Sequence, residues 1–200
     1  MKTPIAHSLN LITELEKLKS IQRKTTVKAD NNRRENSAEH SWQVALSAYI
    51  LSDFIDIEVD VNKVIQMLLI HDVVEIYAGD LFAFADSTQK AQQMHNEYNA
   101  IADLYKKFPS NKAKEIKSLW IEFEEGKTPE AKFALSVDRF LPFLQNINNQ
   151  GGSWNEFNIS KQQILERNKT LAEVSSTLWH YMNEKLDEAV DKGWITERSM

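Results

Sequence analysis

The chain has 200 residues, of which 42% are hydrophobic and 26% charged, a balance typical of one compact domain, 1–200, rather than a disordered chain. It contains no cysteine, which excludes disulfides and thiol catalysis and restricts any metal site to His, Asp and Glu. A net charge of −5 argues against binding to nucleic acid polymers, which need a basic surface. Neither a signal peptide nor a membrane-spanning apolar run is evident, so we expect a cytoplasmic protein.

The N-terminal part of the chain predicts one helix followed by a loop. Residues 8–22 carry apolar side chains at every third position, which is the period of an amphipathic helix. The polar stretch 24–36 is predicted to be a loop. It belongs to a basic segment between Lys17 and Arg34, which is either a solvated surface or a landing place for a small anionic substrate.

Capping residues mark the helices that follow. The predicted helix starts are Asn36 with Glu39 in a capping box, Asp60, Ser110, and Thr128 with Pro129. The predicted helix ends are Gly79, Pro109 and Gly126. No segment alternates between apolar and polar residues as a half-buried strand does, so we predict an all-α bundle of six or seven helices.

The C-terminal part predicts a loop and then one long helix. The glycine-rich segment 148–156 is expected to be a connecting loop, with a mobile lid as the alternative. A helix over about 160–192 follows. Trp179 and Trp194 on this segment could support a homodimer, and ordinary packing in the core is the alternative for both.

A pair of ionisable residues interrupts the most apolar segment, "LLIHDVVEIYAGD" (68–80). The predicted helix 61–78 is apolar almost all round and should therefore run through the centre of the bundle. At about 100° per residue, His71, Asp72 and Glu75 fall on one arc of this helix. A buried carboxylate must be paired or bound to a metal, because leaving it isolated is energetically costly.

Two further polar residues occupy apolar stripes, namely His40 in the second predicted helix and Asp138 in the helix that begins at Thr128. A hydrogen bond to a neighbouring helix could explain the burial of His40 or of His71 taken singly, and an Asp–Arg pair could explain that of Asp138. Taken together, two imidazoles and two carboxylates suit a first-row transition metal that keeps open positions for water and substrate.

These residues and their surroundings resemble a known family. The order His40, His71-Asp72, Asp138 resembles the H…HD…D signature of the HD-domain metal-dependent phosphohydrolases. "ENSAEHS", "HDVVEIYAGD" and "PEAKFALSVD" resemble motifs of the branch that includes the 5′-deoxynucleotidases. The resemblance implies an HD-domain bundle with its metal-binding core at about 36–145. It also implies a metal-dependent hydrolase of small phosphomonoesters such as nucleoside 5′-monophosphates.

The resemblance also implies roles for single residues. The implied ligands of one divalent ion (Mn, Co, Fe, Zn or Mg) are His40, His71, Asp72 and Asp138. Glu75 would perform acid/base chemistry beside the metal-bound water, and Asp80 would line the site or orient a ligand histidine. Arg23 resembles the arginine that holds the substrate phosphate. Lys24 stands where the characterised 5′-deoxynucleotidases commonly carry a tryptophan that shapes sugar selection, so their deoxyribose preference does not carry over.

Two other functions fit the same residues. An HD-type bundle with additional carboxylates could hold two irons and carry out oxygen chemistry, although four ligand residues favour a single metal. A non-catalytic binding protein, in which the metal only ties helices together, is the third candidate. The presence of Glu75 and Asp80 as acid/base groups favours the hydrolase.

Overall fold

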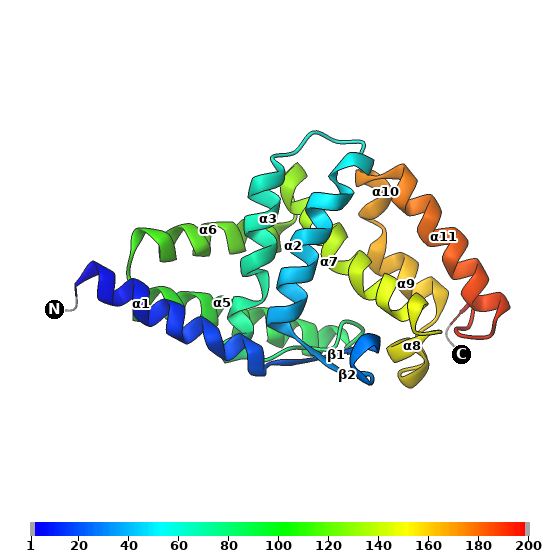
Figure 1. The fold of residues 1–200 in the computed structure, drawn as a ribbon, viewed down its shortest axis with the longest axis horizontal. Helices are drawn as coiled ribbons and strands as arrows, with labels where there is room; N and C mark the ends of the chain where they lie inside the picture. The colour runs from blue at the N-terminus through cyan, green and yellow to red at the C-terminus, as the bar shows by residue number, and fades with distance from the viewer. Residues whose placement is uncertain (1–2, 199–200) are drawn as a thin grey trace.

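The computed structural model describes residues 3–198 and is mainly helical (Figure 1). The α-helices are α1 (Pro4–Leu15), α2 (Ser37–Leu51), α3 (Val61–Ile70), α4 (Glu75–Ala78), α5 (Ser87–Lys107), α6 (Asn111–Glu125), α7 (Pro129–Asn148), α8 (Gly152–Glu156), α9 (Lys161–Asn168), α10 (Leu171–Val174) and α11 (Ser176–Asp191). Short 3₁₀ helices are η1 (Glu16–Ser20), η2 (Lys28–Asp30), η3 (Ser52–Phe54) and η4 (His71–Val74). The all-α prediction is confirmed, with more and shorter helices than the six or seven expected. Within residues 3–198, none of these helices combines the length and apolarity that a membrane span requires.

Helix boundaries that were predicted from polar caps are confirmed. The Asn36 side chain accepts from the Glu39 backbone N–H while the Glu39 carboxylate accepts from the Asn36 N–H, which completes the capping box of α2. Asp60 and Thr128 cap α3 and α7 through their side-chain oxygens. Gly126 ends α6 at a φ of 61°. Caps are local features, which explains why the sequence alone located these ends.

The stretch 24–36 contradicts the prediction of a loop. It forms most of an antiparallel hairpin of β1 (Gln22–Val27) and β2 (Arg33–Asn36), in which Thr26 pairs with Arg34. The buried residues of this hairpin, Thr25 and Glu35, are polar. The alternation of apolar and polar residues that announces a strand is therefore absent from the sequence.

The predicted helix 61–78 is also wrong as one continuous α-helix. It is divided into α3, η4 and α4, and the 3₁₀ turn carries the His-Asp pair. The His71 imidazole Nδ1 donates to the Leu68 carbonyl at 2.8 Å. In a continuous α-helix that carbonyl would accept from the backbone N–H of Asp72, so the side chain competes with the α-helical bond.

The C-terminal segment departs from prediction in two places. The helix expected over 160–192 is divided into α9, α10 and α11. The second break occurs because Ser175 adopts an extended conformation and caps α11 by accepting from the Leu178 N–H. The segment 148–156 contains α8, whose Trp154 is buried and lies 6.0 Å from Phe143 between ring centroids. This segment therefore contains a short helix that packs against α7 and is not simply a solvent-exposed connecting loop.

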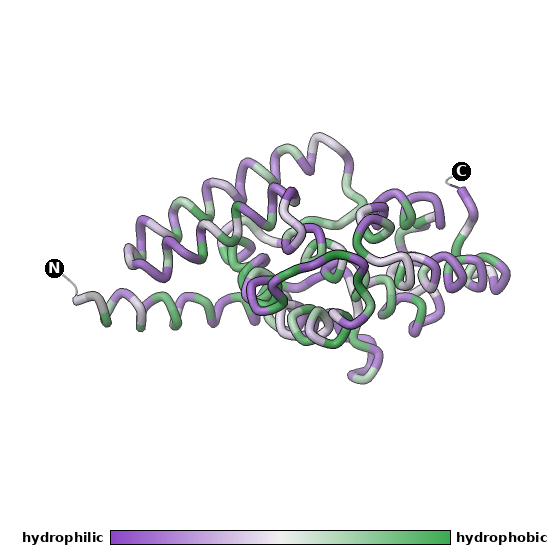
Figure 2. The backbone as a smooth tube through the Cα atoms, turned by 90° about the horizontal axis from the view of Figure 1, so that it is seen from above, coloured by the Kyte–Doolittle hydropathy of each residue, from purple (hydrophilic) through white to green (hydrophobic). Residues whose placement is uncertain are grey.

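Three helices form the centre of the bundle: α2, α3 and α7 (Figure 1). Val64, Met67 and Leu68 of α3 are 0% exposed there, as predicted for a central helix, although Leu69 on the outer side is 47% exposed. A second apolar cluster joins α7 to α8, α9 and α11, and a third joins α1 to α5 and α6. Figures 1 and 2 show that the N-terminus and the C-terminal helices lie toward opposite ends of the molecule.

Candidate metal centre and substrate cavity

Four predicted side chains converge between the central helices. His40 comes from α2, His71 and Asp72 from η4, and Asp138 from α7. Asp138 Oδ1 lies 2.9 Å from His40 Nε2 and 3.4 Å from His71 Nε2. Asp72 Oδ1 lies 3.0 Å from His71 Nε2, and the ligand atoms of His40, His71 and Asp72 all lie within 4.8 Å of one another. The structure thus brings together the whole predicted set.

The His71 imidazole tests whether this set fits a cation. Because the Leu68 carbonyl can only accept, His71 must donate from Nδ1, and Nε2 is left as the atom directed at the two carboxylates. Nε2 is buried and makes no hydrogen bond within the described residues. A lone pair facing carboxylate oxygens is repulsive unless a positive charge lies between them. Two nitrogens and two carboxylates therefore fit a divalent metal ion.

The charges of the carboxylates agree with a site for a cation. Burial lowers the pKa of His71, but the charges of Asp72 and Asp138 outweigh this effect and raise the pKa to about 9. Burial would raise the pKa of Asp138, yet the hydrogen bond with His40 and the neighbouring His71 imidazole hold it well below its usual range. A proton on His71 Nε2 and a metal ion would compete for the position between the carboxylates. Metal binding must release that proton.

Glu35 is a buried carboxylate that the sequence analysis did not single out. It is 1% exposed, and its Oε1 accepts from Gln145 Nε2 at 2.8 Å. Its Oε2 lies 3.4 Å from His40 Nδ1 and 3.5 Å from Arg23 Nε. Burial raises the pKa of Glu35, but the contacts with His40 and Arg23 lower it by more than burial raises it, so the carboxylate is ionised. It can hold the Nδ1–H of His40 and leave Nε2 for a metal. Its position in the motif "ENSAEHS", which also contains His40, is the feature of the sequence that could have identified Glu35 as a site residue.

Glu75 lies beside the metal centre in a different electrostatic setting. It is 7% exposed, and its Oε2 accepts a hydrogen bond from Ser37 Oγ at 2.5 Å. Burial and the neighbouring charge of Asp72 raise the pKa of Glu75 well above its ordinary value. Glu75 therefore holds a proton more readily than an ordinary carboxylate, which is the property of a general acid or base.

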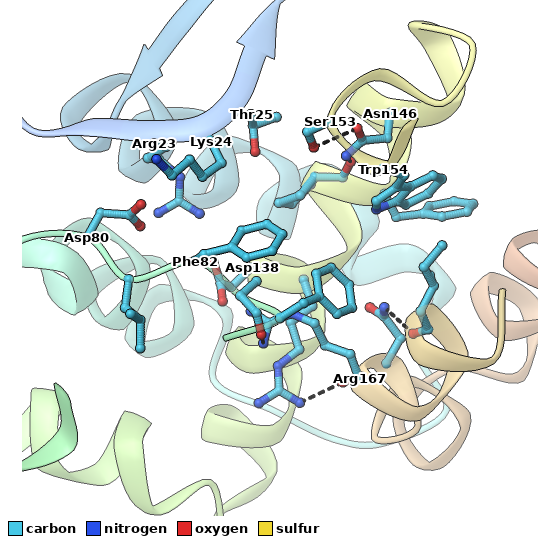
Figure 3. A pocket seen from close by; sticks show the side chains of 18 of the residues that line it. Arg23, Lys24, Thr25, Asp80, Phe82, Asp138, Asn146, Ser153, Trp154 and Arg167 are labelled. Atoms are coloured by element: carbon cyan, nitrogen blue, oxygen red, sulfur yellow. Dashed lines mark hydrogen bonds between the residues drawn. The ribbon is translucent and has the colours of Figure 1, made fainter. Parts of the chain in front are cut away.

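The predicted anion-binding residues open onto a cavity of about 170 Å³ next to the metal centre (Figure 3). Arg23 is only 14% exposed at its side chain, and its Nη1 donates to Asp72 Oδ2 at 2.9 Å. Lys24 and Asp80 line the same cavity, and Asp80 directly follows Gly79, whose φ is 75°. Burial raises the pKa of Asp80 to about 6 although Arg23 opposes the rise. The basic segment is thus divided: Arg23 faces the cavity, while Arg33 and Arg34 pair with exposed acids.

The far end of the cavity contains residues that the sequence analysis missed. Phe82, Phe143 and Trp154 give it aromatic walls, and Ser153 Oγ donates to Asn146 Oδ1 at 2.9 Å. Figure 3 shows Arg23, Lys24 and Asp80 at one end, Asn146, Ser153 and Trp154 at the other, and Phe82 and Asp138 between them. Aromatic residues in a helical chain are expected in the core, so nothing in the sequence marked this end as a binding surface.

Comparisons with known proteins agree with this geometry. A family model described as HD domain matches residues 15–179. A human 5′-deoxynucleotidase, HDDC2, is 27% identical over 137 residues, or 68% of this chain and just under two thirds (65%) of the human protein. The Dictyostelium discoideum protein of that name is 32% identical over 134 residues, or 64% of this chain and 70% of the relative. The crystal structure of a predicted metal-dependent phosphohydrolase from Magnetospirillum magnetotacticum MS-1 is 36% identical, covers 96% of this chain and 95% of its own, and superposes with a TM-score of 0.88.

Proposed function

The chain belongs to the HD domain family of metal-dependent phosphohydrolases, and we propose that it hydrolyses nucleoside 5′-monophosphates. One observation carries the proposal: two histidines and two carboxylates meet at one point, beside a cavity that a buried arginine shares. The names of the 5′-deoxynucleotidase relatives support a nucleotide as the substrate. Because Lys24 stands where a tryptophan is expected, we propose hydrolysis of both ribose and deoxyribose monophosphates.

We propose that His40, His71, Asp72 and Asp138 hold one divalent metal ion, which could be Mn, Co, Fe, Zn or Mg. When bound, such an ion lowers the pKa of water and offsets the charge of a phosphate oxygen. Glu35 would fix the orientation of His40, and the Leu68 carbonyl fixes that of His71. A cluster with four ligand residues supports one metal rather than the two irons of an oxygenase.

The residues around the centre would bind the phosphate and move a proton. The Arg23 guanidinium, with Lys24 beside it, would bind the non-bridging oxygens of the phosphate, because its planar N–H groups match them in pairs. Glu75 would carry a proton at Oε1 or Oε2 between the attacking water and the leaving oxygen of the nucleoside. Ser37 holds that carboxyl group in place through its hydrogen bond to Oε2. Asp80, on the same wall, would orient Arg23 or a substrate hydroxyl.

We also propose a homodimer in the cytoplasm, where nucleoside monophosphates are made and consumed. Trp179 and Trp194 pack against the C-terminal core, so they do not supply the dimer face. The candidate face instead lies on α1 and α2, whose large apolar side chains are 44–67% exposed: Ile5, Leu9, Ile12, Trp42, Leu46, Tyr49 and Ile50. Light scattering should show a dimer that Trp42→Glu dissociates. A monomeric unaltered protein would contradict this assembly.

Phosphate release is the direct test of the proposed function. Metal-loaded protein is incubated with the ribo and deoxyribo 5′-monophosphates of all common bases and with simple sugar phosphates. We expect phosphate to appear from nucleotides and to disappear with Arg23→Gln, while Arg33→Gln, which removes an exposed paired arginine, leaves it unchanged. Hydrolysis of sugar phosphates alone would contradict the nucleotide substrate. Two bound irons with oxygen uptake would favour the oxygenase.

A further inference from the structure

Two arginines beside the metal centre lack a carboxylate partner. Arg139 and Arg167 both line the cavity that holds Arg23, and neither is within ion-pair distance of an acidic side chain among residues 3–198. The arginines Arg23, Arg33 and Arg34, in contrast, each pair with at least one carboxylate. Half-buried guanidinium groups are seldom left without a counter-ion, because removing them from water is costly. Within the described residues, the charge of Arg167 is offset only by carboxylates beyond ion-pair distance, such as that of Asp138.

Backbone carbonyl groups hold both guanidinium groups in place. Arg139 Nη1, on α7, donates to the carbonyl of Arg167 at 2.9 Å. Arg167 Nη1, on α9, donates to the carbonyl of Ala83 at 3.4 Å, and its Cζ lies 6.0 Å from the ring centroid of Phe84. A guanidinium carries five N–H donors, and each of these two uses one of them within the described residues. Most of their donors remain available on a pre-oriented frame.

The metal centre changes the electrostatic balance of this pair. In Figure 3, Asp138 lies between Arg23 and Arg167. Burial lowers the pKa of Arg167, and the nearby cations Arg139 and Arg23 lower it further, while Asp138 and Asp80 act in the opposite direction. A metal ion bound to Asp138 would take up the negative charge that offsets the two arginines. In the metal-loaded protein they would then attract an anion.

We propose that Arg139 and Arg167 form a second anion subsite, and that the substrate is a nucleotide with a second phosphate besides the one hydrolysed, as in a nucleoside 3′,5′-bisphosphate. This inference rests on the proposed function, because the first phosphate is the one held at Arg23 and the metal centre. Paired guanidinium groups match phosphate oxygens bidentately. Lys90 lines an adjoining hollow with both arginines, together with Gln162, Gln163 and Glu166, and has no ion pair within the described residues.

Binding measurements on a slow variant test the subsite. Metal-loaded Glu75→Gln protein is titrated calorimetrically with deoxyadenosine 5′-monophosphate and with deoxyadenosine 3′,5′-bisphosphate. We expect the bisphosphate to bind at least about tenfold more tightly, as charge-assisted hydrogen bonds to a second phosphate would provide. Adding Arg139→Gln or Arg167→Gln should remove most of that advantage and change monophosphate binding by less than about twofold.

Lys169→Gln is the matched control, because it removes a cation from the end of the same helix outside the cavity and should alter neither affinity. If a glutamine variant loses its helical circular dichroism, Arg167→Lys replaces it and should keep only part of the preference. Equal affinity for both nucleotides, or equal weakening of both by the variants, would overturn the subsite. Turnover of the unaltered enzyme is measured separately. Hydrolysis of monophosphates without a bisphosphate preference contradicts only this inference, and a binding preference without any hydrolysis contradicts only the proposed function.

Discussion

Two clusters built around buried carboxylates differ in how completely the protein's own atoms satisfy their hydrogen bonds. At Glu14 on α1, one oxygen accepts from Lys17 Nζ at 2.8 Å, from Tyr77 Oη at 2.8 Å and from Lys107 Nζ at 3.0 Å. At the metal centre, more deeply buried polar atoms are left without hydrogen-bond partners within the described residues: Arg23 Nε, Glu35 Oε2, His40 Nδ1 and His71 Nε2.

This difference distinguishes a cluster that only stabilises the fold from a cluster that binds a ligand. Folding selects against buried polar atoms without partners, because each carries an uncompensated loss of hydration. The Glu14 cluster obeys that rule using only the chain's own atoms. At the metal centre a cation would supply the missing partner of His71 Nε2, so the chain retains an atom that is unfavourable without the ion. Substitutions in the two clusters should therefore affect different properties, metal and turnover in one and stability in the other.

The largest expected effect follows from removing a ligand. His71→Ala should lose the bound metal and reduce phosphate release by at least about a thousandfold, because the chemistry depends on the ion. Elemental analysis after dialysis and a phosphate assay measure the two properties. His95→Ala is the control, since His95 is an exposed histidine of α5 whose side-chain hydrogen bond, among residues 3–198, is with Asn99. A His71→Ala protein that retains stoichiometric metal would show that the imidazole is not a ligand.

A smaller effect is expected when the metal stays but the proton carrier is lost. Glu75→Gln should bind metal normally and hydrolyse nucleotides at least about tenfold more slowly, since an amide cannot exchange the proton. The hydrogen bond from Ser37 can persist to the amide oxygen, so the local structure should be kept. Elemental analysis and initial rates from the same preparation measure both properties. Unaltered turnover would remove Glu75 from the mechanism.

Glu35→Gln tests whether the contact between Glu35 and the proposed ligand His40 affects metal affinity. Replacing the carboxylate that faces His40 Nδ1 should weaken metal binding by about ten- to a hundredfold, which is the usual effect of losing a partner of a metal-bound histidine. Glu39→Gln, in the same sequence motif, is the control because Glu39 pairs with exposed Arg33. Competition with a chelator measures the affinities. Equal affinities in the two variants would mean that Glu35 acts only in packing.

The same contrast explains which parts could be predicted from the sequence. His71, Asp72 and Asp138 were conspicuous because each interrupts an apolar stripe, and Asn36 and Asp60 because capping is decided within three residues. Glu35 escaped notice because it lies in a polar stretch, where burial leaves no trace in the pattern. The hairpin of β1 and β2 escaped for the same reason, since its inward residues are polar.

Long-range features were beyond local pattern analysis for a different reason. The division of the segment 61–78 depends on one side-chain bond, from His71 to the Leu68 carbonyl, which no propensity scale contains. Arg139 and Arg167 look like ordinary surface arginines in the sequence. Their lack of carboxylate partners emerges only when α7 and α9 are packed together. A sequence can thus predict the ligands of a centre more readily than the walls of the cavity beside it.

The smallest effect is expected at the satisfied cluster and completes the comparison. The hydrogen bond from Lys17, with those from Tyr77 and Lys107, lowers the pKa of Glu14 from 4.5 to about 2, against the opposing effect of burial. A carboxylate with a lowered folded-state pKa stabilises the protein above its unfolded-state value, and this stabilisation is lost as the pH falls from 4.5 towards 2. Glu14→Gln should therefore lower the free energy of unfolding by about 1 kcal/mol at neutral pH, with metal content unchanged. Urea unfolding at pH 7 and pH 3 measures the difference, which should shrink at the lower pH because the unaltered protein loses its advantage there. A difference that is the same at both values would mean that the charge of Glu14 contributes nothing and that only its shape matters.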